Sequence, residues 1–295
     1  MKKQPGIVNL LLSLIIFLSL ASSAVGLFWQ EGGQPFDFTS IHGASIKIYG
    51  QGLYKFDTYF KAPIFRGTDA VTLFIAIPLL IVGMVLSNRG LLRGRIFLAG
   101  ILSYFLYVSA SLSFGAAYNF LFLVYIILFS TSFFTFVTTL SSFDLQSLPA
   151  HFSPRLPRRF IAGFLFVEGL SVFVWLIDII SGLTTGQVPA GLAHYTTDIT
   201  AVIDIGIIPP AAYLAGILML RRSPLGFVLA PILMILNALV GMMVLVQTIF
   251  QSMAGITLST GQVIAYVGIF VTTSLFAIYL TFRFFKNMSE SKISS

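Results

Sequence analysis

The sequence contains no cysteine and very little charge. The absence of cysteine excludes disulfides, thiolate metal sites and redox-active cysteine pairs. Asp, Glu, Lys and Arg together make up only 9% of the 295 residues, whereas 57% are hydrophobic. In a soluble domain of this length about a quarter of the residues are charged. The chain is therefore predicted to be an integral membrane protein.

The sequence also lacks the motifs of several familiar chemistries. Its three histidines, His42, His151 and His194, lie outside the apolar stretches, so no pair is placed to ligate a haem inside a bilayer. No predicted span holds a lysine for a retinal Schiff base. There is no H-E-x-x-H run, phosphate-binding glycine loop or nucleophile elbow. His194 and Asp198, one turn apart, are too few ligands for a convincing metal site. We predict neither a metal nor a cofactor.

Long apolar stretches are what the chain has in abundance. A helix needs about 20 apolar residues to cross a bilayer. Stretches of about this length, separated by Gly, Pro or charged residues, predict an all-α polytopic membrane protein with eight transmembrane helices in one membrane domain, 1–295. The predicted spans are 7–28, 70–88, 97–115, 119–140, 160–183, 203–220, 225–250 and 262–284.

The first span has an alternative interpretation. Lys2 and Lys3, the apolar run that follows and small residues at Ser22 and Ala24 also fit a cleavable secretory signal in residues 1–24. Cleavage would leave seven spans. We favour a retained helix, because the apolar stretch continues as far as Trp29 and is then long enough to cross a membrane.

Positive charge is distributed unevenly between the predicted loops. Most of the 17 Lys and Arg fall in short segments on one side, including a basic, proline-rich cytoplasmic loop, 141–159. The others lie in one long outer segment, 30–69, where the positive-inside bias is weak: Lys47, Lys55, Lys61 and Arg66. This pattern predicts that both chain ends are cytoplasmic, in a prokaryotic cytoplasmic membrane. The net charge of +7 is expected to favour anionic inner-leaflet lipid, with no nucleic-acid partner.

The two halves of the chain share a layout. Each has a Tyr-x-x-Asp pair, a further Asp, an inward helix with proline, and an Arg followed five residues later by Gly. The residues are Tyr54, Asp57, Asp69, Pro78, Arg89 and Gly94 in the first half, and Tyr195, Asp198, Asp204, Pro209, Pro210, Arg221 and Gly226 in the second. This pattern suggests a parallel 4+4 repeat about an axis along the membrane normal. Alternatively, there is no repeat, and Gly, Pro and Arg mark helix ends and breaks as they do in any polytopic chain.

Acidic residues within predicted spans are the strongest pointers to function, since a charge at bilayer depth costs about 2.5–3.5 kcal/mol on insertion scales. Glu168 is predicted near the midplane, and Ser171, Trp175 and Asp178 follow it on the same helix face. Asn237 lies at a similar depth. Glu168 with Asn237 is a candidate deep proton site, and Glu168 is either a neutral structural group or a proton-coupling group.

Other polar features within the spans have a structural explanation. Tyr104, Tyr107 and Ser111 form a stripe that we interpret, like Asn237, as hydrogen bonding between helices. Pro78 and the Pro209–Pro210 pair interrupt the two inward helices. Such interruptions in corresponding positions can mark a transporter's site, although simple kinks are common in membrane helices.

The outer face gathers the remaining polar groups. Asp69 and Asp204 are individually explained as helix N-caps. Asp178 is predicted near a helix C-terminus, where negative charge is disfavoured. We therefore predict that Arg66 pairs with Asp178 or is shared between Asp69 and Asp178. The full set of binding candidates is Asp57, Arg66, Asp69, Tyr118, Asn119, Asp178, His194, Tyr195, Asp198 and Asp204.

Three functions remain open. The favoured one is a small transporter with an outward-facing, carboxylate-lined cavity for a small polar or cationic solute. The second is a membrane-embedded enzyme acting on a lipid-linked substrate at the outer leaflet, with carboxylates, His194 and tyrosines as acid and base groups. The third is a sensor, assembly or partner-binding module whose outer platform is 30–69. The sequence identifies neither catalytic residues nor an oligomeric state.

Overall fold

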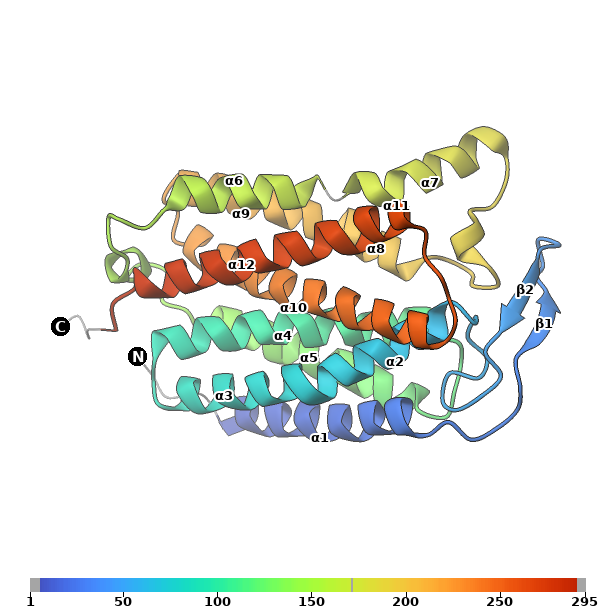
Figure 1. Cartoon of the computed structure of the whole chain (residues 1–295). Helices are drawn as coiled ribbons and strands as arrows, with labels where there is room; N and C mark the ends of the chain where they lie inside the picture. Colours follow the sequence, from blue (N-terminus) through green and yellow to red (C-terminus); the bar gives the residue numbers. More distant parts are fainter. Residues whose placement is uncertain (1–5, 171, 291–295) are drawn as a thin grey trace.

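The computed structural model describes residues 6–170 and 172–290, which form a helical bundle with a small β-hairpin at one end (Figure 1). In the described part of the chain, seven helical segments are long and apolar enough to cross a membrane. They are Gly6–Phe28, Lys61–Asn88, Leu92–Gly115, Phe122–Ser141, Ile199–Leu220, Gly226–Met253 and Ile269–Lys286. The protein is thus an all-α multi-pass membrane protein, as its composition predicts.

The elements follow one another in this order: α1 (Gly6–Phe28), β1 (Phe36–Thr39), β2 (Ser45–Ile48), α2 (Lys61–Val71), a π-helical turn η1 (Thr72–Ala76), α3 (Ile77–Asn88), α4 (Leu92–Gly115), α5 (Phe122–Ser141), η2 (Leu148–His151), α6 (Arg158–Gly169), α7 (Val172–Thr185), η3 (Ala190–Leu192), α8 (Ile199–Gly206), α9 (Ile208–Leu220), α10 (Gly226–Met253), α11 (Thr260–Gln262), a second π-helical segment η4 (Val263–Gly268) and α12 (Ile269–Lys286).

The predicted span 160–183 falls on two shorter helices, α6 and α7. They follow one another along one side of the bundle (Figure 1). Near the junction, Gly169 packs against the ring of Tyr213 on α9, and a Cβ there would lie 2.7 Å from a ring carbon. The close approach of α6 to α9 therefore depends on the absence of a side chain at Gly169.

Both inward helical segments are interrupted close to the predicted prolines. In the first, η1 separates α2 from α3, and Pro78 stands at the start of α3. In the second, α8 ends at Gly206, and Pro209 and Pro210 lie in the first turn of α9. Proline has no N–H to donate and tolerates the first turn of a helix. The first interruption is a wide helical turn and the second is a break.

The capping interpretation of Asp69 and Asp204 is wrong. The helix expected at 70–88 begins at Lys61, so Asp69 lies inside α2 and the end of the predicted outer segment is helical. Asp204 likewise lies inside α8. The cap of α8 is Asp198, whose side chain accepts hydrogen bonds from the backbone N–H groups of Thr200 and Ala201. Another reason must therefore account for these two acids.

Two helices, α4 and α10, form the centre of the bundle and are the most buried of the candidate spans. They pack against each other, with α3 and α5 beside α4 and with α9 and α12 beside α10. The N-terminal helix α1 packs against α2, α3 and α5, and its Leu12 and Ile15 are fully buried. The first helix thus contributes to the core.

Equivalent contacts recur in the two halves. Gly94 packs on the backbone carbonyl carbon of Leu86, and Gly226 packs in the same way on Leu218. Gly67 of α2 packs against Gln247 of α10, while Gly115 of α4 packs against Ile199 of α8. The same sequence interval separates Gly94 from Gly226, Gly67 from Ile199, and Gly115 from Gln247. The two contacts thus join positions that are related by one constant sequence interval.

Candidate functional site

The candidate site is a cavity of about 270 Å³ inside the second half of the bundle. Side chains from α4, α6, α7, α8, α9, α10 and α12 enclose it. They are Tyr107, Val167, Glu168, Leu170, Trp175, Asp204, Ile208, Leu236, Asn237, Val240, Ile269, Phe270 and Thr273. Most of the lining is apolar. Among the described residues that form it there is no lysine, arginine or histidine, and the ionisable groups are the two carboxyls and the Tyr107 phenol.

Asp204 lines the cavity from α8. Tyr107 of α4 and Trp175 of α7 are its polar neighbours there, so side chains from three helices come together at one carboxyl group. Counting 1.5 Å per residue from the basic end of α9 at Leu220, Asp204 lies about 24 Å into the bundle. An apolar bilayer core is about 30 Å thick, so this acid lies within it.

Glu168 lies deeper, about 15 Å from the start of α6 by the same count. It is 5% exposed, and the side chain of Asn237 on α10 is its polar neighbour. Its Oε2 and the Oδ1 of Asn237 are buried without a hydrogen-bond partner among the described residues. An unpaired buried oxygen costs free energy, so these two acceptors are available to a proton donor that enters the cavity.

The arrangement suits a small cation with an apolar body. The two carboxyl groups and the free amide oxygen of Asn237 can bind a positive group. Trp175, Tyr107 and Phe270 offer aromatic faces that attract cations. Within the part of the chain that the structure describes, no group of three or more His, Asp or Glu could hold a metal ion. Carboxyl groups beside aromatic faces are a donor set suited to an organic cation or an amine.

The cavity contains only part of the predicted polar stripe. Glu168 and Trp175 both line it, as helical spacing predicts, but Asp178 is exposed on α7. Ser171 lies outside the described residues. Asn237, predicted with Glu168 as a deep proton site, also lines the cavity, and so does Tyr107, which sequence alone assigned to helix–helix hydrogen bonding. The contribution of α12 was missed, since Phe270 and Thr273 are ordinary residues of an apolar helix.

A second polar cluster joins the outer segments of the two halves, and we name its residues Asp57, Lys61, Tyr195 and Asp198 the outer latch. Oδ1 of Asp57 accepts hydrogen bonds from the Tyr195 hydroxyl (2.8 Å) and the Ala117 N–H (2.8 Å). Asp57 is fully buried, and burial raises its pKa from 3.8 to about 7. Its other oxygen has no partner among the described residues.

The remaining residues of the outer latch add an ion pair and aromatic contacts. Lys61 Nζ lies 3.9 Å from Asp198 Oδ1 and 4.3 Å from the centroid of the Tyr195 ring. His194 packs beside Tyr195 with ring centroids 4.3 Å apart, and partial burial lowers the pKa of its imidazole. The outer latch therefore fastens the first outer segment to the loop before α8.

A third cluster lies between α1 and α2. Asp69 is buried and accepts a hydrogen bond from the Tyr54 hydroxyl at 2.7 Å. Gly26 of α1 approaches Asp69 so closely that a Cβ there would collide with the carboxyl group. Arg66 donates to the Tyr49 hydroxyl and to the backbone oxygen of Leu27, each at 3.2 Å. The acid here is held between packed helices.

The predicted ion pair between Arg66 and Asp178 is wrong. Asp178 is exposed on α7, and the ion pairs of the described residues do not include one between these side chains. Tyr118 is 76% exposed. Asn119 accepts a hydrogen bond from the Leu121 N–H at the start of α5. Instead of lining one outer cavity, the predicted candidates are distributed among the cavity, the outer latch, the α1–α2 contact and the surface.

No family model matches this chain, and no match was found among curated proteins or solved structures.

Proposed function

We propose that this protein is a small transporter and that the cavity containing Glu168 and Asp204 is its solute site. The observation that carries the proposal is that two acids on different helices face one cavity at bilayer depth, between interrupted helices. Acids at such depth are characteristic of ion, proton and solute pathways, and interrupted helices accompany transporter sites near the midplane.

The proposed solute is a small organic cation, such as an amine with an apolar or aromatic body. A cavity of about 270 Å³ with a mostly apolar lining holds a small molecule rather than a bare metal ion. Asp204, beside Tyr107 and Trp175, would orient the positive group. Glu168, with a free oxygen, would exchange a proton as the solute enters or leaves.

The topology that we propose has eight spans, with α6 and α7 together forming the fifth and both chain ends cytoplasmic. The arginines of the loops before α4, before α6 and before α10 support this orientation, because positive residues are retained on the cytoplasmic side. The exchanged Gly67–Gln247 and Gly115–Ile199 contacts support a parallel 4+4 repeat. The setting that we propose is a prokaryotic cytoplasmic membrane.

An enzyme acting at the outer leaflet is less well supported. Its acid and base groups would be Asp57, His194 and Tyr195, but Asp57 is fully buried and its bonded oxygen is committed to Tyr195 and Ala117. A substrate would have to open the outer latch before it reached the carboxyl group.

Trp175 provides a direct test, because the chain has only two tryptophans. In a Trp29→Phe background, Trp175 is the single tryptophan, and its fluorescence can be quenched by N-methylpyridinium, a cation, or by acrylamide, which is neutral. We expect the cation to quench more strongly than acrylamide relative to free tryptophan. Adding Glu168→Gln and Asp204→Asn should abolish the excess while leaving acrylamide quenching unchanged.

Asp178→Asn is the matched control, since it removes an exposed acid from the same helix as Trp175. It should leave the excess intact. Uptake of labelled N-methylpyridinium into proteoliposomes under an imposed pH gradient then tests transport itself. Uptake that requires Glu168 would support the proposal. Excess quenching without uptake would indicate a binding module, and no excess quenching would reject the cation site.

A further inference from the structure

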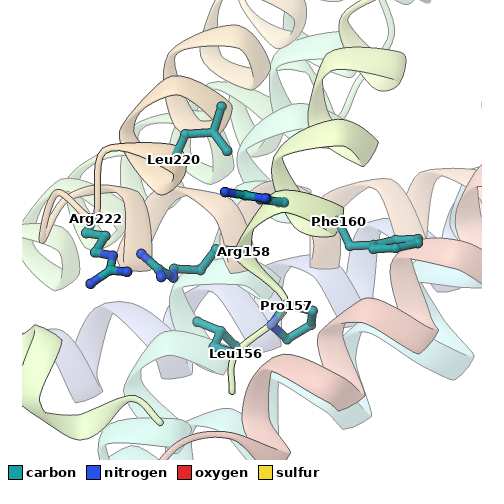
Figure 2. Close-up of a pocket in the computed structure, with 7 residues that line it drawn as sticks. Leu156, Pro157, Arg158, Phe160, Leu220 and Arg222 are labelled. Atoms are coloured by element: carbon teal, nitrogen blue, oxygen red, sulfur yellow. The ribbon is translucent and has the colours of Figure 1, made fainter. Parts of the chain in front are cut away.

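A second cavity lies at the opposite, basic end of the bundle, between the start of α6 and the end of α9. Its volume is about 400 Å³, and it is lined by Leu156, Pro157, Arg158, Arg159, Phe160, Leu220 and Arg222. The side chains of Arg158 and Arg222 point toward one another across it (Figure 2). Three guanidinium groups thus share one small hollow.

No acidic side chain balances this charge. Of the chain's ten acids, those at the basic end are Asp144 and Glu290. Asp144 is exposed and accepts a hydrogen bond from the Gln146 N–H within its own loop. Glu290 is paired with Arg93, its Oε1 lying 3.5 Å from Arg93 Nε. Like charges repel, so the three arginines of the hollow favour an anion from outside the chain.

The start of α4 shows how this protein pairs an arginine at a helix N-terminus when an acid is present. There Glu290 accepts hydrogen bonds from the backbone N–H groups of Leu92 and Arg93, each at 2.9 Å, and pairs with the Arg93 side chain. The start of α6 has arginines in the first turn, and its N-cap residue, Pro157, gives no side-chain hydrogen bond. The Arg158 N–H donates to the Leu156 carbonyl at 2.8 Å, so an anion here would be held by the arginine side chains.

We propose that the hollow binds the phosphate of an anionic phospholipid. Arginine suits phosphate because its planar fork can donate two parallel hydrogen bonds to it. The apolar surroundings favour a lipid over free phosphate. Phe160 and Leu220, at 74% and 47% exposure, stand beside the arginines on the outside of the bundle, where the first carbons of an acyl chain would contact them. We name this hollow the headgroup site.

Native mass spectrometry of the whole protein in detergent tests the inference. Phosphatidylglycerol, phosphatidylcholine and inorganic phosphate are added separately at equal concentrations. We expect one phosphatidylglycerol to be retained with higher affinity than phosphatidylcholine. The Arg158→Gln, Arg222→Gln double variant should weaken this binding about 25-fold, because each arginine near an anionic headgroup contributes about fivefold.

Arg155→Gln is the matched control, because Arg155 is an exposed arginine of the same loop that does not line the hollow. It should retain the lipid preference. Equal retention of the two lipids would overturn the inference, and so would a phosphate adduct without lipid selectivity. The inference would also be overturned if Arg155→Gln lost the lipid preference to the same extent as the double variant. That result would mean that the overall positive charge of this end, and not the hollow, selects the lipid. None of these outcomes depends on whether the protein transports a solute.

Discussion

The buried carboxyl group of the outer latch makes a quantitative prediction about stability and pH. In the folded protein, burial raises the pKa of Asp57 from 3.8 to about 7. Between these values the folded state keeps a proton that the unfolded state has lost, so stability falls as pH rises and levels off above about pH 7. Each pH unit corresponds to about 1.4 kcal/mol. Over the whole interval this one group contributes roughly 4 kcal/mol.

Asp57→Asn should remove this dependence. Asparagine does not titrate, and its oxygen can still accept the hydrogen bonds from the Tyr195 hydroxyl and the Ala117 N–H. The variant should therefore gain stability relative to the wild type as pH increases from 5 to 7.5. We expect the difference in Tm to grow by about 5 °C, since ~1 kcal/mol moves the Tm of a chain of this size by a few degrees.

The assay is thermal unfolding in detergent at closely spaced pH values, with the Tm of the wild type subtracted from that of the variant. Subtraction cancels the titration of the other buried acids. Asp37→Asn, in the exposed strand β1, is the control and should give a flat difference. A flat or falling difference for Asp57→Asn would refute the reasoning, because it would mean that Asp57 is already ionised in the folded protein at pH 5.

Two further predictions concern packing and helix capping. A Cβ at Gly67 would lie 2.5 Å from a backbone atom of α10, whereas at Gly115 it would meet a side chain. Gly67→Ala should therefore lower the Tm more than Gly115→Ala. Equal decreases in Tm would mean that the α10 backbone shifts as easily as a side chain. Glu290→Ala should cost about 1 kcal/mol, as the loss of a helix cap does, seen as a Tm decrease of a few degrees. Glu31→Ala, at an exposed acid, serves as its control, and an equal decrease there would exclude a capping role.

The sequence was sufficient to predict most of the membrane-spanning helices, because hydropathy and span length respond to the same bilayer thickness. The first helix ends at Phe28, as predicted. The start of α2 could not be predicted, since Lys61, Arg66 and Asp69 make this part of the helix resemble a polar loop. In the structure two of these residues contact Tyr49 and Tyr54 of the outer segment, which no local pattern reveals.

The site was predictable only as far as one helix at a time. Helical periodicity correctly brought Glu168 and Trp175 together, because both belong to one continuous run of sequence. Asp204 meets Tyr107 and Trp175 through the packing of three helices, and sequence spacing contains no information about such contacts. The capping rule misled at Asp204 because a better cap, Asp198, stands one and a half turns earlier.

The two proposed sites lie at opposite ends of the same pair of packed helices. Helix α6 has Arg158 of the headgroup site at its start and Glu168 of the cavity near its end, while α9 has Ile208 in the cavity and Leu220 in the headgroup site. The helices pack through Gly169 against Tyr213 and through Gly216 against Phe166. Such close contacts transmit a displacement of one helix to the other, because packed interiors yield little. A lipid held at the basic end would therefore restrain both helices that line the cavity, so a change in N-methylpyridinium quenching of Trp175 on adding phosphatidylglycerol would reveal coupling between the sites.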